Sequence, residues 1–185
     1  MRTFVAIPVV ADLPSRYLME CREFLQAARA DVKWVAGGHF HLTLRFVGDA
    51  SEDDVAALKK CVRALAGIGP IEATLAGAGA FPSVARAQTL WAGVTDPAKR
   101  IAGLERSLSE SLESEGFPPE RKPFHPHITL GRVRSPRGLA ALTHELQKWD
   151  SQGRTMPWRL DRVTVFESRL TPSGPIYTPL LEVPL

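Results

Sequence analysis

The chain has few cysteines and no long apolar run, and both shortages narrow the classes of protein to which it can belong. Only two of its 185 residues are cysteine, and both Cys21 and Cys61 fall on the apolar sides of predicted helices. Two cysteines do not make a disulfide scaffold, so we expect a protein of the reducing cytoplasm. No apolar stretch approaches the roughly 20 residues of a membrane-spanning helix. We therefore expect no membrane partner.

A large excess of charge of either sign is also missing. The formal net charge is +3, and 44% of the residues are hydrophobic. With this composition we do not expect a disordered chain, and the length suits one globular domain, which we expect to be a monomer. The charge is unevenly distributed, because residues 117–170 hold ten Lys and Arg against five Asp and Glu. A basic C-terminal half suits a polyanionic ligand, although an ordinary solvated surface would have the same composition.

The chain contains an internal repeat. Three pairs of segments match one another: Thr3–Val9 with Thr89–Thr95, His41–Leu44 with His127–Leu130, and Leu75–Phe81 with Leu160–Phe166. The first two pairs are offset by 86 residues and the third by 85. A near-constant offset over three segments predicts two related structural units, residues 3–81 and 89–166, within a single bilobal domain spanning residues 1–185.

Each copy of the repeat has the same predicted order of elements. Apolar residues recur at helical spacing in four stretches, between residues 17 and 28, 55 and 65, 101 and 112, and 139 and 149. Ser51-Glu-Asp-Asp54 resembles a capping box at the start of the second helix. Each copy therefore reads strand, helix, histidine strand, helix, strand. We expect an α+β fold of two lobes related by a pseudo-twofold axis, each an antiparallel sheet backed by helices, with a cleft between them.

The histidine strands carry the strongest functional signal. Side chains two residues apart on a strand share a face, so His41 lies with Thr43 and His127 lies with Thr129, while leucine and isoleucine occupy the opposite, packing faces. A single histidine on a strand is more often structural than catalytic. Core packing does not explain the same polar pair on the non-packing face twice. We therefore interpret both pairs as functional and expect the repeat to aim them at one cleft.

Two histidines and two hydroxyl groups suit in-line displacement at phosphorus. The pKa of histidine, ordinarily near 6.5, allows one imidazole to accept a proton while another donates one at neutral pH. Threonine hydroxyls can donate hydrogen bonds to the non-bridging oxygens, and an arginine can offset their charge. This pattern does not distinguish which histidine is the acid.

These residues resemble a known family. HLTLRFVG at residues 41–48 and PHITLGR at residues 126–132 are similar to the paired motifs of the two-histidine phosphoesterase superfamily. Within it, the chain is most similar to the RNA 2′,3′-cyclic phosphodiesterase family, historically called 2′-5′ RNA ligases. Flanking segments such as RTFVAIPV at residues 2–9, LWAGV at residues 90–94 and FESRL at residues 166–170 extend the similarity over nearly the whole chain.

The resemblance implies an enzyme that hydrolyses RNA 2′,3′-cyclic phosphate ends to 2′-phosphomonoesters with no metal and no cofactor. It implies that His41 is the proton donor, that His127 is the proton acceptor, and that Thr43 and Thr129 bind the phosphate. The implied partners are RNA, including tRNA fragments, or nucleoside 2′,3′-cyclic phosphates.

Three further residues are candidates for substrate binding. Strand alternation predicts that Arg45 shares the face of His41, and that Arg132 points away from His127 unless the strand bulges. The family motif nevertheless has an arginine at position 132, so we keep both arginines as candidates for ligand contact. Phe124 is a candidate for stacking on a base; Phe81 is another, although core packing is favoured for it.

Three rival interpretations stay open. His39 and His125 create two His-x-His pairs, a spacing that also suits metal ligands, but no carboxylate lies close in the sequence and metal binding leaves the threonines unexplained. The chain could instead be a nucleotide-binding module without turnover, although its intact histidines and threonines favour an enzyme. The same two histidines also suit ATP-independent 2′-5′ ligation of RNA ends.

Overall fold

Strands and helices alternate along most of the chain in its computed structural model, which describes residues 1–185. In chain order the elements are β1 (Arg2–Pro8), α1 (Asp12–Gln26), β2 (Val32–Trp34), β3 (His41–Asp49), α2 (Glu52–Arg63), β4 (Ile71–Phe81), β5 (Thr89–Thr95), α3 (Arg100–Ser114), β6 (His127–Val133), α4 (Leu139–Ser151), β7 (Thr155–Leu160), β8 (Arg162–Thr171) and β9 (Gly174–Pro184). The helices lie where the apolar spacing predicts them. The predicted capping box starts α2, since the Ser51 hydroxyl accepts from the Asp54 amide and the Asp54 carboxylate accepts from the Ser51 amide.

All the strands belong to one curled sheet in which every pairing is antiparallel. The strand order is β7-β4-β5-β6-β3-β1-β8-β9, and the short β2 pairs with β6 outside this order. The histidine strands β3 and β6 are therefore neighbours at the centre of the sheet. The expected α+β fold, with antiparallel strands and a central cleft, is confirmed.

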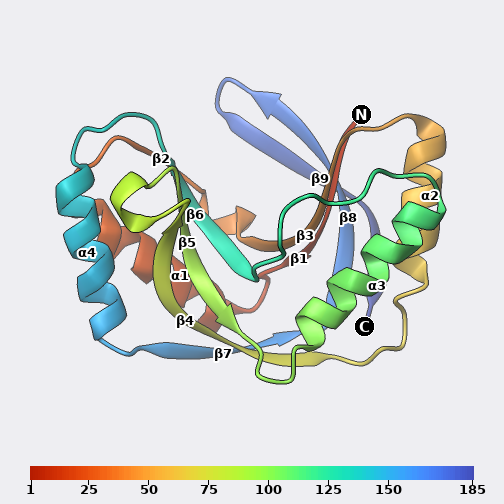
Figure 1. Ribbon diagram of the computed structural model, residues 1–185, viewed down its shortest axis with the longest axis horizontal. Helices are drawn as coiled ribbons and strands as arrows, with labels where there is room; N and C mark the ends of the chain where they lie inside the picture. The colour runs from red at the N-terminus through yellow and green to blue at the C-terminus, as the bar shows by residue number, and fades with distance from the viewer.

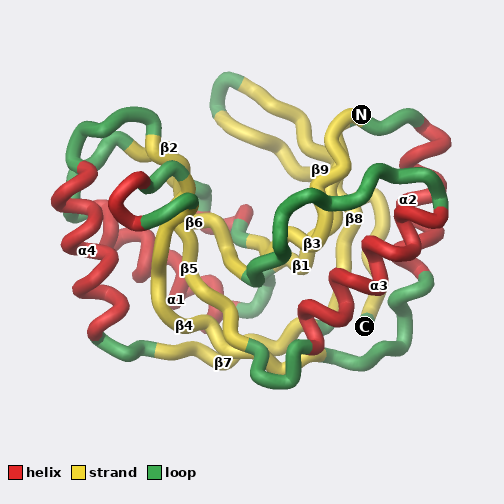
Figure 2. Tube along the Cα trace, viewed as in Figure 1, coloured by secondary structure: helices red, strands yellow, loops and turns green.

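Helices cover the two ends of the sheet (Figures 1 and 2). In the first lobe, α2 and α3 pack against one another and against β3, β8 and β9. In the second lobe, α1 and α4 pack against one another and against β4, β6 and β7.

The lobes do not follow the two halves of the sequence. The elements α1 and β4 come from the first half of the sequence but lie in the second lobe, beside β5 and β6. Conversely, α3 and β8 come from the second half but lie in the first lobe, beside β3 and β1. The two copies of the repeat are thus interleaved, and neither can bury its apolar faces without the other.

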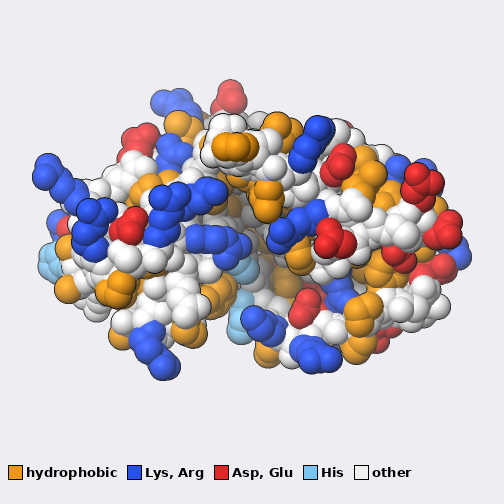
Figure 3. Space-filling model, turned by 90° about the horizontal axis from the view of Figure 1, so that it is seen from above, with side chains coloured by type: hydrophobic (Ala, Val, Ile, Leu, Met, Phe, Trp, Pro, Cys, Tyr) orange, Lys and Arg blue, Asp and Glu red, His pale blue; other side chains and the backbone are white.

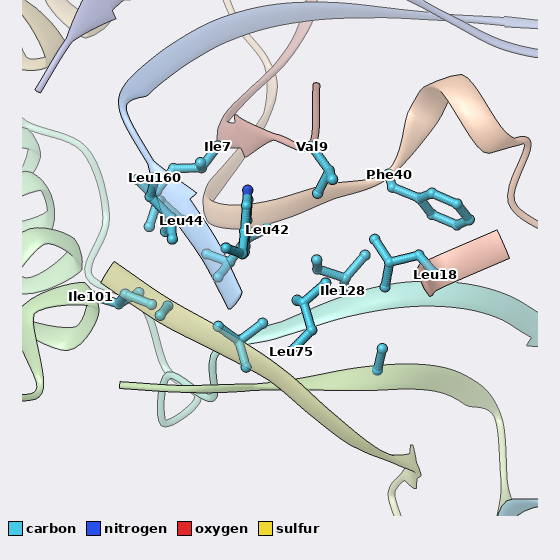
Figure 4. Close-up of a cluster of buried hydrophobic side chains, with 14 of the residues drawn as sticks. Ile7, Val9, Leu18, Phe40, Leu42, Leu44, Leu75, Ile101, Ile128 and Leu160 are labelled. Carbon is cyan, nitrogen blue, oxygen red and sulfur yellow. The ribbon is translucent and has the colours of Figure 1, made fainter. Parts of the chain in front are cut away.

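The packing faces of the histidine strands lie in the hydrophobic core. Leu42, Leu44, Ile128 and Leu130 are buried within it, and Figure 4 shows Leu42 and Ile128 among the surrounding aliphatic side chains. Burial of each such side chain stabilises the fold by about 1.5–3 kcal/mol. This gain determines which face of each strand turns inward, and so leaves the histidines on the other. No helix is long and apolar enough to cross a bilayer.

Candidate active site

The two histidine strands are registered at one point, where Leu42 of β3 pairs with Ile128 of β6. Because the pairing is antiparallel, the neighbouring residues face one another across the strands, His41 opposite Thr129 and Thr43 opposite His127. All four side chains lie on the face opposite the buried Leu42 and Ile128. The histidines are thus diagonal neighbours, a relation that corresponds to about 7–8 Å between strands.

Both imidazole rings are held in the same way. Nδ1 of His41 lies 2.7 Å from the carbonyl oxygen of His39, and Nδ1 of His127 lies 2.6 Å from the carbonyl oxygen of His125. A carbonyl oxygen can only accept a hydrogen bond, so Nδ1 carries the hydrogen in both rings. Nε2 is left as the atom that accepts a proton when the ring is neutral and donates one when it is charged.

The surroundings favour the neutral form of both rings. Burial lowers the pKa of His41, an effect that the bond to the His39 carbonyl opposes and that the nearby His39 and His127 rings reinforce. Burial likewise lowers the pKa of His127, with smaller contributions in the same direction from His125 and Arg132. An anionic phosphate arriving between the rings would favour protonation of one of them and so prepare an acid beside a base.

Aromatic side chains flank each ring. The ring of Phe4 lies 5.0 Å from that of His41, and Tyr177 meets His41 edge-on at 5.4 Å. Phe81 meets His127 edge-on at 4.9 Å. Phe81 therefore contacts a candidate catalytic residue. These contacts restrict both imidazoles to one orientation.

A cavity of about 450 Å³ opens on the His41 side of the pair. His41, Thr43 and Tyr177 line it, whereas His127 and Thr129 do not. Its walls come from both lobes, since residues 33–36 face the β8–β9 hairpin across it. Lys and Arg side chains surround this hollow, in which histidine atoms are visible (Figure 3). Apart from the titratable His39 and His41, the charged residues that line it are all cations: Arg2, Lys33 and Arg132.

The prediction that Arg45 shares the face of His41 is wrong. Along the β1–β3 pair, Ala6 faces Thr43 and Val5 faces Arg45, so Leu44 is an extra residue that forms a β-bulge. The bulge reverses the alternation, and Arg45 turns toward the packing side. Its side chain is buried, with 6% of the residue exposed, and its guanidinium donates to the carbonyl oxygen of Pro118.

A matching bulge brings Arg132 into the site. Along β5–β6, Trp91 faces Thr129 and Leu90 faces Gly131, so Leu130 is the extra residue. Arg132 consequently lies on the cleft face and lines the cavity, where its Nη1 donates to the Thr89 hydroxyl over 3.2 Å. Regular strand alternation predicts that Arg132 points away from His127 unless the strand bulges. The strand does bulge, so Arg132 shares the cleft face with His127.

Phe124 lies elsewhere, contrary to the prediction that it stacks on a base. It is partly buried against the hydrophobic core and borders a separate groove beside α3. The physical reason is the path of the chain, since the residues before β6 cross the α3 side before they reach the cleft.

The additional histidines are divided between the two sides of the site. His39 lines the cavity next to Tyr177, with ring centres 4.9 Å apart, and His125 lies 6.2 Å from Phe81. No group of three or more His, Cys, Asp or Glu side chains is placed to hold a metal ion.

Arg2, Lys33, Phe46 and Tyr177 line the cavity and were not among the predicted site residues. Lys33 and Arg2 reach the cavity because β2 pairs with β6 and β1 pairs with β3. Neither pairing has a signal in the local sequence.

Comparisons with known proteins point to one family. The sequence pattern of the 2′-5′ RNA ligase superfamily matches residues 15–171. The RNA 2′,3′-cyclic phosphodiesterase of Methanothermobacter thermautotrophicus is 36% identical over 182 residues, which cover 96% of this chain and 95% of that protein. The RNA 2′,3′-cyclic phosphodiesterase of Aeropyrum pernix is 32% identical, with 90% and 93% covered.

Two solved structures superpose on this chain over its whole length. The protein TT0787 of Thermus thermophilus superposes with a TM-score of 0.81 at 26% identity, covering 100% of this chain and 98% of that one. E. coli LigT complexed with 3′-AMP gives a TM-score of 0.70 at 27% identity, covering 100% and 97%.

Proposed function

Because this chain belongs to the 2′-5′ RNA ligase superfamily, we propose that it hydrolyses 2′,3′-cyclic phosphate ends of RNA to 2′-phosphomonoesters, with His41 and His127 as its acid and base. The observation that carries the proposal is the duplicated His-x-Thr strand. One pairing, Leu42 with Ile128, sets the two copies side by side on the same face. Relatives of nearly the same length that bear the name RNA 2′,3′-cyclic phosphodiesterase support the substrate class.

The proposed reaction uses the two free Nε2 atoms. Nε2 of neutral His127 accepts a proton from water as the water oxygen bonds to phosphorus. The bond from phosphorus to the 3′-oxygen breaks, and protonated His41 delivers its proton to that oxygen. The 2′-oxygen keeps its bond, so the product is a 2′-phosphomonoester. Each proton transfer contributes typically ~10²–10⁴ in rate.

The threonines and Arg132 are proposed to stabilise the phosphate. The hydroxyls of Thr43 and Thr129 lie on the face of the histidines and can donate to the non-bridging oxygens. Arg132 lines the same cavity and influences the pKa of His127, so its charge acts at the reacting centre. In this site the guanidinium offsets the negative charge of the phosphate as the attacking oxygen adds to it.

The shape of the cleft supports these acid and base roles. In an in-line reaction the attacking water and the leaving 3′-oxygen lie on opposite sides of phosphorus. The leaving oxygen belongs to the nucleoside, which needs the larger space, and that space lies on the His41 side. A water molecule needs little room and suits the His127 side. The geometry therefore favours His41 as the acid.

A short RNA ending in a 2′,3′-cyclic phosphate, incubated with the protein and a chelator, tests the proposal. We expect a 2′-phosphomonoester product, identified by its resistance to enzymes specific for 3′-phosphates. Loss of activity on chelation would favour the metal interpretation. Binding of the cyclic phosphate without turnover at any pH between about 5 and 8 would favour a nucleotide-binding module.

Ligation is the second candidate, because the matching superfamily is described as 2′-5′ RNA ligases. In that reaction an RNA 5′-hydroxyl replaces water as the nucleophile, and the same histidines transfer the protons. Incubation with half-tRNA fragments that carry a cyclic phosphate and a 5′-hydroxyl would show whether joining or hydrolysis predominates.

We propose further that residues 1–185 act as one bilobal domain, as a monomer, in the cytoplasm. The interleaving of the two repeat copies supports a single domain, because neither copy completes a lobe alone. Both cysteines are buried and unbonded, which suits a reducing compartment. Size-exclusion chromatography with light scattering tests the oligomeric state.

A further inference from the structure

The cavity extends well beyond the reacting centre. Phe46, which lines it, pairs with Phe4, whereas His41 pairs with Pro8, so the two lie four β1 residues apart, about 13 Å at the strand rise of 3.3 Å per residue. Beyond His41 the cavity is also lined by Leu170 and Gly174 of the β8–β9 hairpin, which projects from the sheet in Figure 1. A cyclic phosphate and its ribose do not fill this length.

Two cations line the cavity in addition to Arg132, and the proposed reaction uses neither of them. Arg2 lies on the first lobe, and Lys33 lies on the second, in the strand that pairs with β6. Neither forms a salt bridge, and no Asp or Glu lines the cavity. The Arg2 guanidinium lies over the ring of Phe46, 5.1 Å from its centre, which holds it in place. Cations without partners on opposite walls of one cavity favour an anion between them.

Resting on the proposed function, we propose that Arg2 and Lys33 bind phosphodiester groups on the 5′ side of the cyclic phosphate, so that the enzyme acts on oligonucleotide ends in preference to nucleoside 2′,3′-cyclic phosphates. A nucleoside cyclic phosphate has its only phosphate between the histidines and leaves both cations unpaired. An oligonucleotide supplies one further phosphate per residue along the same cavity. The exposed apolar surfaces of Phe46 and Leu170 suit the faces of its bases.

The test compares two substrates that have the same reacting group. One is uridine 2′,3′-cyclic phosphate, and the other is a four-residue oligouridylate ending in the same cyclic phosphate. The measured quantity is the ratio of kcat/KM for the oligonucleotide to kcat/KM for the nucleoside. We expect this ratio to exceed about tenfold for the wild type, the effect of one charge-assisted contact. It should fall by about that factor in Arg2→Gln and in Lys33→Gln.

Salt dependence gives a second readout. For the oligonucleotide, log(kcat/KM) should fall with log salt concentration, and each variant should reduce the slope by about 0.7, the value for one phosphate contact on a single strand. Arg63→Gln is the matched control, because Arg63 is exposed on α2 and distant from the cavity. The ratio and the slope should both keep their wild-type values in this variant.

The possible outcomes separate the two proposals. If the wild type opens both rings but shows no preference, or if the three variants have the same ratio, the assignment of Arg2 and Lys33 is wrong while the proposed function stands. If the wild type opens neither ring, the proposed function itself fails, and this inference fails with it.

Discussion

Leu42 of β3 pairs with Ile128 of β6, and this is the one register contact between the two histidine strands. Both side chains are fully buried, so the residues on either side of each must face the cleft. The core thereby sets the geometry of the proposed catalytic pair, although neither Leu42 nor Ile128 touches the substrate. A stable apolar contact on one face of the sheet holds four polar side chains together on the other.

His41→Ala and His127→Ala should each reduce kcat by at least ~10²-fold, because each removes one of the two proton-transfer groups. Both rings lie on the cleft face, so the melting temperature at pH 8 should change little. Turnover of the cyclic-phosphate RNA and thermal unfolding measure the two effects. His144→Ala, on the exposed side of α4, is the control for loss of an imidazole. Near-normal turnover in either site variant would disprove the acid–base assignment.

The rate should depend on pH through both histidines. Burial lowers both pKa values below about 6.5, and the reaction needs one ring protonated and one neutral. We therefore expect kcat/KM to be greatest below pH 6.5 and to fall as the pH rises above it. The bound phosphate raises the pKa of the acid, so the kcat profile should lie at higher pH than the kcat/KM profile. Coincident profiles with an optimum above pH 8 would contradict this.

The same shifts should make stability depend on pH. A histidine whose pKa is lowered in the folded state binds its proton more readily when unfolded, so stability falls as the pH falls from about 6.5 toward the folded-state pKa. Denaturant unfolding at pH 8 and pH 5 measures the loss. His41→Ala should lose less stability than the wild type over this interval, and an equal loss would show that His41 is not the source.

Thr43→Ala and Thr129→Ala should each reduce kcat/KM by about 10–100-fold, because one hydrogen bond to a charged group is worth about 1.5–3 kcal/mol. These losses should be smaller than those of the histidine variants. Thr→Ser at either position keeps the hydroxyl and should restore most of the activity. If serine is as defective as alanine, the hydroxyl is not what the substrate needs.

The two arginines should behave in opposite ways. Arg132→Gln should reduce kcat/KM by about tenfold or more with little change in melting temperature, because its guanidinium lines the cavity. Arg45→Ala should lower the free energy of unfolding by about 1–3 kcal/mol, since its buried side chain is lost. Measured well below the melting temperature, its kcat/KM should change less than that of Arg132→Gln. The reverse pattern would contradict the bulged register of both strands.

The amino-acid sequence by itself determined the repeat, the helices and the faces of the histidine strands. These features depend on local periodicity, since Leu42 and Leu44 alternate with His41 and Thr43, and alternation requires no knowledge of the neighbouring strand. Sequence reasoning was therefore correct about which four side chains share the cleft face.

Only the tertiary structure decided how the arginines point and where the substrate has room. The bulges at Leu44 and Leu130 arise from register against β1 and β5, and they turn Arg45 inward and Arg132 toward the cleft. The exchange of elements between the lobes, and the cavity that joins Arg2 to Lys33, likewise depend on contacts between residues far apart in the chain. Periodicity describes one strand at a time, whereas register and packing are properties of strands in pairs.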